Sequence, residues 1–200
     1  MGKNQSLEQP FRLILASTSK YRGELLSQLG WEFDAVAPGV DEEKIKKKGM
    51  TPRELALELS KLKAQAVSCK YPHACVIGSD QVCTLGNHIF DKPGTTDAAM
   101  EQLSFMQGKS HQLITAVTVL HPDGMEVILN ETTLHMRKLT LPQIHAYVQA
   151  DKPLDCAGSY KLESRGIKLF EKIEMSDHTA IIGLPLIELT NTLLKLGYSL

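Results

Sequence analysis

The chain has 200 residues, of which 42% are hydrophobic, enough to build one sizeable core. Its 22 Lys and Arg residues nearly balance its 23 Asp and Glu residues, so the formal net charge is −1. This balance argues against nucleic-acid or membrane binding by bulk charge. It is still compatible with a local basic cluster that binds one small anion. The four cysteines lack zinc-binding spacing and are expected to be reduced residues in or near the core of a cytoplasmic protein.

The predicted elements begin after a flexible tail at residues 1–10. A buried strand is expected at 12–16, a helix at 21–29 and a second strand at 32–37, followed by an exposed charged stretch at 40–50. Thr51 is the predicted N-cap of the next helix, with Pro52 at its first position and Glu54 completing a capping box. This helix should run to about Cys69 and bury Leu55, Leu59, Leu62 and Ala66.

The second half of the chain mixes strands and helices without strict alternation. Expected first are a strand at 74–77, a turn at 86–87, a helix at 96–106 and a hairpin at 111–139 whose turn is Pro122-Asp123-Gly124. A helix start at 140–143, with Thr140 as N-cap and Gln143 completing a capping box, a strand at 167–173 and a C-terminal helix at 183–197 follow. The pattern predicts an α/β fold, with an elongated mixed sheet flanked by helices on both faces. No shift in composition marks a linker, so residues 11–200 are predicted to form a single domain.

Hydroxyl and basic side chains gather where the first strand meets the first helix. Ser17, Thr18 and Ser19 are followed by Lys20 and, after one aromatic residue, by Arg22. Free backbone N–H groups and the helix dipole attract anions at a helix start, and Arg can grip a phosphate with two bonds. The stretch therefore indicates a phosphate site, although a plain Ser N-cap beside exposed basic residues would also explain it.

Two carboxylates and one further lysine are the other candidate functional residues. Asp80 ends an apolar run, where it can bind a divalent cation or accept a proton from water, or simply cap a turn. Glu42 lies in an acidic run that can equally be a solvated surface, and Lys92 precedes a proline in extended backbone. Together these groups fit metal-assisted hydrolysis of a phosphoanhydride. The motifs of P-loop NTPases, dinucleotide-binding folds, Ser hydrolases and zinc metalloproteases are absent from the sequence.

An ordered set of segments resembles the Maf family of nucleotide pyrophosphatases over about residues 11–197. The segments are LILASTSKYRGELLSQLG, VDE, KLKAQAV, IGSDQV, DKP, HQLITAVTV, PLDCAGSYKLE and IIGLPL. The resemblance implies a Maf/ITPase-like fold with a cleft between two lobes. It also implies hydrolysis of nucleoside triphosphates to monophosphate and diphosphate with Mg²⁺ or Mn²⁺, and suggests a homodimer.

The resemblance also assigns roles to residues of this chain. Asp80 would be the catalytic proton acceptor, supported by Glu42 and Lys63, and Glu42 and Asp80 would hold the metal. The substrate phosphates would be bound by Ser17, Ser19, Arg22 and Lys92. Two departures from the family pattern occur: Leu62 stands where an acidic residue usually precedes the lysine, and Asp91 replaces the glycine before Lys92.

Three further positions are expected to select the base. Tyr21, Gln81 and Glu163 match a branch that resembles 7-methyl-GTP pyrophosphatases, whereas the dTTP and UTP branch has Arg, Thr and Gln there. The usual aromatic residue in this branch is Trp, so stacking on Tyr21 should be weaker. A cationic methylated guanine suits an aromatic face and a carboxylate.

Alternative functions remain open at this point. The chain could act on dTTP, UTP or a modified pyrimidine by the same chemistry, or bind nucleotides without turnover as a regulator of septum formation. The net charge and the lack of an aromatic and basic stripe disfavour a nucleic-acid-binding module. We expect a nucleoside triphosphate substrate, and no nucleic-acid or membrane partner.

Overall fold

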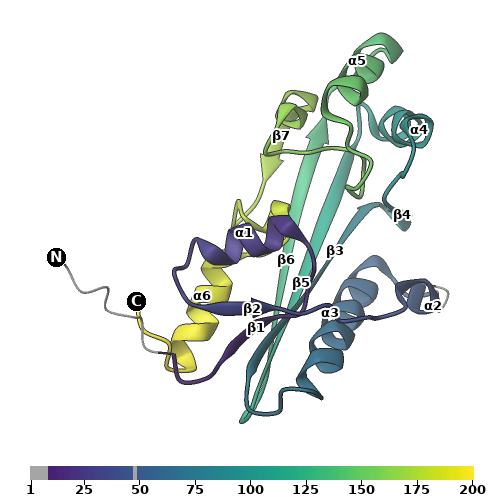
Figure 1. The fold of residues 1–200 in the computed structure, drawn as a ribbon. Coiled ribbons are helices and arrows are strands. Elements are labelled where there is room, and N and C mark those ends of the chain that lie inside the picture. The colour runs from purple at the N-terminus through teal and green to yellow at the C-terminus, as the bar shows by residue number, and fades with distance from the viewer. Residues whose placement is uncertain (1–8, 47–48) are drawn as a thin grey trace.

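The protein is built on one long mixed sheet, seen in a computed structural model that describes residues 9–46 and 49–200 (Figure 1). The predicted tail at 1–10 therefore lies almost entirely outside the described residues. The strands are β1 (Leu13–Leu15), β2 (Phe33–Ala35), β3 (Cys75–Leu85), β4 (His88–Phe90), β5 (Ser110–His121), β6 (Gly124–Met136) and β7 (Phe170–Glu174). The α-helices are α1 (Lys20–Ser27), α2 (Glu42–Lys46), α3 (Pro52–Ser68), α4 (Thr96–Met106), α5 (Leu141–Asp151) and α6 (Leu186–Lys195), and the 3₁₀ helices are η1 (Arg165–Leu169) and η2 (Ala180–Ile182).

The sheet combines a parallel part and an antiparallel part. Its strand order is β2-β1-β3-β5-β6-β7, with β4 paired to one end of β3. β1 is parallel to β2 and β3, whereas β3, β5, β6 and β7 pair antiparallel in that order. The predicted mixed sheet is therefore confirmed.

The alternation of side chains along β1 explains why helices cover both faces. Leu13 and Leu15 point into a core with α1 and α6, whereas Ile14 and Ala16 pack on the opposite face against α3. A strand buried on both faces reads as a continuous apolar run, which is what residues 13–16 show.

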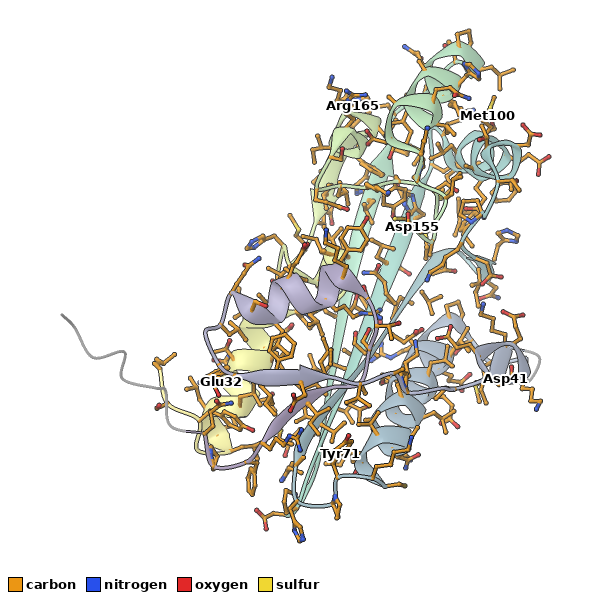
Figure 2. The ribbon with its side chains drawn as sticks, in the orientation of Figure 1. Glu32, Asp41, Tyr71, Met100, Asp155 and Arg165 are labelled. Carbon is orange, nitrogen blue, oxygen red and sulfur yellow. The ribbon has the colours of Figure 1, made fainter. Side chains whose placement is uncertain are left out.

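Two lobes share the long strands β3, β5 and β6 (Figure 1). The first lobe holds β1, β2, α1, α3 and α6 around one end of these strands. The second lobe packs α4, α5 and β7 around the other end, over a separate core that includes Leu103, Leu134, Ile144 and Phe170. Figure 2 shows that Asp155 belongs to the second lobe and lies on its side facing the first.

Most predicted elements are present, and four local expectations need correction. Residues 42–46 form the short helix α2, and β3 continues through Asp80 as far as Leu85, so Asp80 lies within a strand rather than at its end. Within residues 167–173, a 3₁₀ helix occupies the start and the strand begins only at Phe170. Leu62 and Ala66 are only half-buried, because the buried face of α3 is shifted to Ala56, Ser60, Lys63, Ala64 and Val67.

The capping predictions are confirmed. Thr51 and Glu54 form a reciprocal capping box at the start of α3, and Thr140 and Gln143 form one at α5. All four cysteines are free, but Cys69 is exposed rather than near the core. Among residues 9–46 and 49–200, no helix is both long and apolar enough to cross a membrane.

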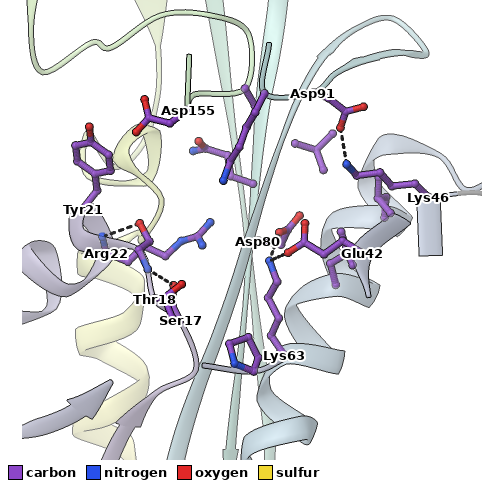
Figure 3. A pocket seen from close by; sticks show the side chains of 18 of the residues that line it. Ser17, Thr18, Tyr21, Arg22, Glu42, Lys46, Lys63, Asp80, Asp91 and Asp155 are labelled. Carbon is purple, nitrogen blue, oxygen red and sulfur yellow. Dashed lines mark hydrogen bonds and ion pairs between the residues drawn. The ribbon is translucent and has the colours of Figure 1, made fainter. Parts of the chain in front are cut away.

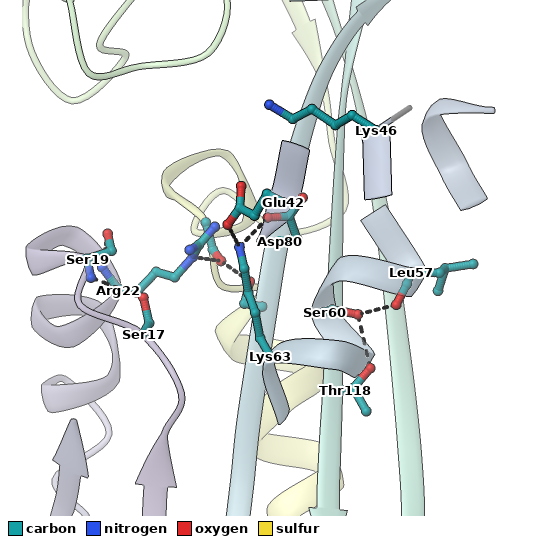
Figure 4. Close-up of polar contacts among 12 residues, drawn as sticks. Ser17, Ser19, Arg22, Glu42, Lys46, Leu57, Ser60, Lys63, Asp80 and Thr118 are labelled. Carbon is teal, nitrogen blue, oxygen red and sulfur yellow. Dashed lines mark hydrogen bonds and ion pairs between the residues drawn. The ribbon is translucent and has the colours of Figure 1, made fainter. Parts of the chain in front are cut away.

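Gly78 permits the contact between α3 and β3 that positions the polar residues described below. A Cβ atom at this position would lie 2.3 Å from the Ser60 carbonyl oxygen and 2.5 Å from the Ala64 backbone nitrogen. On the same turn of α3, the Ser60 hydroxyl bonds the Thr118 hydroxyl of β5 at 3.0 Å (Figure 4). The helix backbone thus lies directly on the strand, and only glycine fits between them.

We predict that Gly78→Ala lowers the free energy of unfolding by about 2 kcal/mol or more, because backbone atoms must move to admit the methyl group. Urea denaturation measures the change. Gly23→Ala is the matched control, since no atom lies within 4 Å of a Cβ built there in α1. The control should be neutral or stabilising by about 0.5–1 kcal/mol, and equal effects of the two substitutions would contradict the role given to Gly78.

Candidate active site

A cleft of about 710 Å³ lies where the two lobes face each other. The loop before α1, helix α2, helix α3 and strand β3 contribute its first-lobe wall (Figure 3). The loop after β4 and the loop around Asp155 contribute the opposite wall. Its lining residues include Ser17, Ser19, Arg22, Glu42, Lys63, Asp80 and Lys92, so seven separately predicted residues share one cleft.

The loop between β1 and α1 is shaped by its own hydroxyl groups. The backbone N–H of Ser19 donates to the Ser17 Oγ at 3.0 Å, and Ser19 is the N-cap of α1, accepting from the Arg22 N–H at 3.5 Å. The first turn of α1 therefore opens directly on the cleft. The sequence offered a phosphate loop and an ordinary N-cap as alternatives, and the geometry is consistent with both at once.

Arg22 is fixed to the far end of the chain. Its Nε donates to the Gly183 carbonyl oxygen at 3.2 Å, and the Ser79 hydroxyl donates to the same oxygen at 2.8 Å. Burial lowers the pKa of Arg22, while Asp80 and Glu42 act in the opposite direction. One carbonyl thus ties the loop between β1 and α1 to β3, and it does so through the Nε of Arg22 rather than through its terminal guanidinium nitrogens.

Lys63 joins the two carboxylates at the base of the cleft. Its Nζ lies 2.6 Å from the Asp80 Oδ1 and 2.7 Å from the Glu42 Oε1 (Figure 4). The Lys63 and Asp80 side chains are 8% and 10% exposed, whereas that of Glu42 is 41% exposed. Three charged groups from α2, α3 and β3 therefore meet at one point.

The two carboxylates have shifted pKa values of opposite sign. Burial raises the pKa of Asp80 and outweighs the attraction of Lys63 and Arg22. Burial also opposes ionisation of Glu42, but there the Lys63, Lys46 and Lys92 ammonium groups prevail and hold its pKa below the usual value. A buried carboxylate with a raised pKa, beside one that stays ionised, is an arrangement suited to proton transfer.

The three predicted base-selecting residues also lie together. Tyr21, Gln81 and Glu163 line a side pocket of about 150 Å³, which shares Arg22 and Lys92 with the main cleft. The Gln81 Nε2 donates to the carbonyl oxygens of Ala180 at 2.8 Å and Ile181 at 3.0 Å. The amide nitrogen is thereby occupied, and Oε1 is the atom of this side chain that can accept a bond from a ligand.

Comparison with known proteins agrees with this geometry. The family model described as Maf-like protein matches residues 12–196. The chain belongs to the Maf family. It is 53% identical to a 7-methyl-GTP pyrophosphatase of Bdellovibrio bacteriovorus over 89% of this chain and 93% of that protein. It is 45% identical to a protein of the same name from Xanthomonas campestris, over 94% and 98% of the two chains.

A solved structure shows the same fold at low sequence identity. The Ham1 protein of Staphylococcus aureus matches with a TM-score of 0.52 and 16% identity, over 92% of this chain and 98% of the other. The predicted Maf/ITPase-like fold class is thus confirmed. At this identity the match concerns the fold alone.

Two carboxylates of the cleft could take part in holding a metal ion, but only together with other ligands. The described residues contain no group of three or more His, Cys, Asp or Glu side chains that could hold an ion by themselves. Glu42 and Asp80 still offer two carboxylates at one point, and Mg²⁺ is commonly bound by one or two carboxylates together with substrate phosphates. Glu42 and Asp80 are therefore the residues that could hold such an ion.

The sequence did not predict several residues of the cleft. Lys46 and Asp155 line the cleft although each stands in a segment with few local signals, and Gly183 holds Arg22 through its carbonyl. The segment IIGLPL was part of the Maf resemblance, but its role was not apparent. Backbone carbonyls leave no trace in residue type, so only the structure finds such a contact.

We predict that Asp80→Asn raises the free energy of unfolding at pH 7. The pKa of Asp80 is higher in the folded protein than in the unfolded chain, so ionisation opposes folding and its cost appears as the pH rises through the folded pKa. The advantage of the variant should therefore be absent at pH 3, below the ordinary Asp pKa of 3.8, and should be larger at pH 7. Urea denaturation of both proteins at each pH measures it, and a penalty that grows with pH would contradict the dominance of burial.

Proposed function

We propose that this protein hydrolyses 7-methyl-GTP to 7-methyl-GMP and diphosphate, a housecleaning activity on modified nucleotides. The names of its relatives support this substrate. The observation that carries the proposal is the shared geometry of the two pockets. A phosphate loop, a buried carboxylate bonded to lysine and an aromatic and acidic side pocket lie along one continuous surface.

The triphosphate is assigned to the basic wall of the cleft. Ser17, Ser19 and Arg22 from the loop before α1, and Lys92 from the second lobe, bind its oxygens. Divalent Mg²⁺ or Mn²⁺, held by Glu42 and Asp80, would neutralise phosphate charge when bound. Lys63 balances the charge of both carboxylates, since its Nζ lies within 2.7 Å of each.

Asp80 is proposed as the proton acceptor. Lys63 bonds its Oδ1, which leaves Oδ2 to accept a proton from water. The water oxygen forms a bond to the α-phosphorus as the bond to the bridging oxygen breaks, and that electron pair leaves on diphosphate. Arg22 and Lys92 stabilise the negative charge that develops on the leaving group.

The side pocket is proposed to bind the base. Methylation at N7 makes guanine cationic, so it stacks favourably on the Tyr21 ring. The guanine N1–H and N2–H₂ groups are donors, and Glu163 and the Gln81 Oε1 are acceptors. The charge of Glu163 further favours a cationic base over neutral GTP.

Two other functions are distinguished by simple outcomes. Turnover of dTTP or UTP would keep the chemistry and change the base, which Tyr21 and Glu163 argue against. A nucleotide-binding regulator without turnover would not require a carboxylate with a raised pKa placed beside a lysine.

We predict that Asp80→Asn lowers kcat by about 10²- to 10⁴-fold, the usual contribution of a general base. Hydrolysis in H₂¹⁸O should place the label in the nucleoside monophosphate of the wild-type reaction, because water attacks the α-phosphorus. Urea denaturation of the same variant measures whether it is folded, which separates lost catalysis from unfolding. Near-wild-type kcat, or label in diphosphate, would contradict the assignment.

We predict that Tyr21→Leu and Glu163→Gln each lower the preference for 7-methyl-GTP over GTP by about fivefold, the scale of one cation–π or charged contact. The ratio of kcat/KM values measures the preference. Glu171→Gln is the charge-matched control, because Glu171 is an exposed residue of β7 outside the pocket. If neither single variant changed the ratio of kcat/KM values, the base assignment would be wrong.

The double variant Tyr21→Arg with Glu163→Gln should shift substrate preference toward dTTP or UTP. The same kcat/KM comparison measures it, and an unchanged preference would contradict the assignment.

A further inference from the structure

Lys46 occupies an unusual place at the mouth of the cleft. It is the last residue of α2, and its Nζ lies 2.5 Å from the Asp91 Oδ1 and 3.0 Å from the Glu43 Oε1 (Figure 3). The Lys46 side chain is 26% exposed, whereas its partners Glu43 and Asp91 are 72% and 60% exposed. Lys46 is thus the more buried partner, and both carboxylates are largely exposed to solvent.

The ion pair joins the two walls of the cleft. Asp91 stands immediately before Lys92, and its carbonyl oxygen accepts a bond from the Gln102 Nε2 of α4 at 2.9 Å. Lys46 is therefore held against a supported segment of the second lobe. Asp91 has no positive φ, so replacing the family's glycine here does not distort the backbone.

Lys46 and Lys92 act on the same region of the cleft. Both line it, and both lower the pKa of Glu42 through their charge. Lys63 lies at the base of the cleft between Asp80 and the half-buried Glu42, whereas both carboxylates paired with Lys46 are largely exposed. Lys46 on α2 and Lys92 on the opposite wall are therefore two cations that the terminal phosphates of a substrate could reach at the outer end of the cleft.

We propose that Lys46 is a further phosphate-binding residue, which contacts the terminal phosphates of the substrate and the diphosphate product from the α2 side. This assignment rests on the proposed function, and it places one lysine on each wall. Before substrate arrives, the exposed carboxylates of Glu43 and Asp91 hold the Lys46 ammonium. A doubly charged phosphate group competes with them for that ammonium, so Asp91 restrains Lys46 rather than assisting binding.

Three variants and one control variant test the proposal by calorimetric titration with diphosphate and Mg²⁺. Lys46→Gln should weaken diphosphate binding about tenfold to hundredfold, which is the scale of one charged hydrogen bond. It should leave the binding of 7-methyl-GMP unchanged. Lys44→Gln is the matched control, because Lys44 lies on the same helix with an 81% exposed side chain outside the cleft. Asp91→Asn should bind diphosphate as well as or better than the wild type, and Lys46→Arg should restore binding.

Each other result overturns the proposal. Equal weakening by Lys46→Gln and Asp91→Asn would show that the pair serves only to hold the walls together. Wild-type affinity of Lys46→Gln, or no diphosphate binding by the wild type, would remove the phosphate contact. The titration needs no turnover, so a protein that fails to hydrolyse 7-methyl-GTP but binds diphosphate through Lys46 would contradict the proposed function and keep this inference.

Discussion

The bond of the Lys63 ammonium to two carboxylates is the constraint on which the site depends. A buried Asp80 without a positive partner would oppose folding, and the two carboxylates would repel each other. Lys63 can stand between them only because α3 lies directly on β3, and that contact requires Gly78. The absence of one Cβ atom in the strand therefore determines where the reactive groups lie.

The long strands explain how one sheet serves two pockets. β3 carries Ser79, Asp80 and Gln81 in succession, and adjacent residues of a strand point to opposite faces. Asp80 turns toward Lys63 of α3, whereas Ser79 and Gln81 turn toward the segment at residues 180–183 on the other side. Successive residues of one strand thus supply Asp80 to the proposed phosphate chemistry and Gln81 to the proposed base recognition.

The sequence predicted most elements, since apolar runs, capping boxes and turn residues are local signals. Thr51, Thr140 and Pro122-Asp123-Gly124 each act within a few residues and were correctly interpreted. The resemblance to the Maf family supplied the candidate site residues, whose proximity in space no spacing rule could provide. Contacts made through backbone or across lobes were missed: the Gly183 carbonyl on Arg22 spans 161 positions, and Lys46 meets Asp91 across 45. Asp80 was placed at a strand end because Gly78 and Asp80 are poor strand formers, but pairing with the distant strand β5 keeps both in β3.

The most direct test of the account is release of diphosphate by the wild-type protein from 7-methyl-GTP, GTP, dTTP, UTP and CTP, with Mg²⁺ or Mn²⁺. Comparing kcat/KM values separates the chemistry from the base preference. The account predicts release of diphosphate with a clear preference for 7-methyl-GTP over GTP. Nucleotide binding without release from any substrate would contradict it and favour a regulatory role.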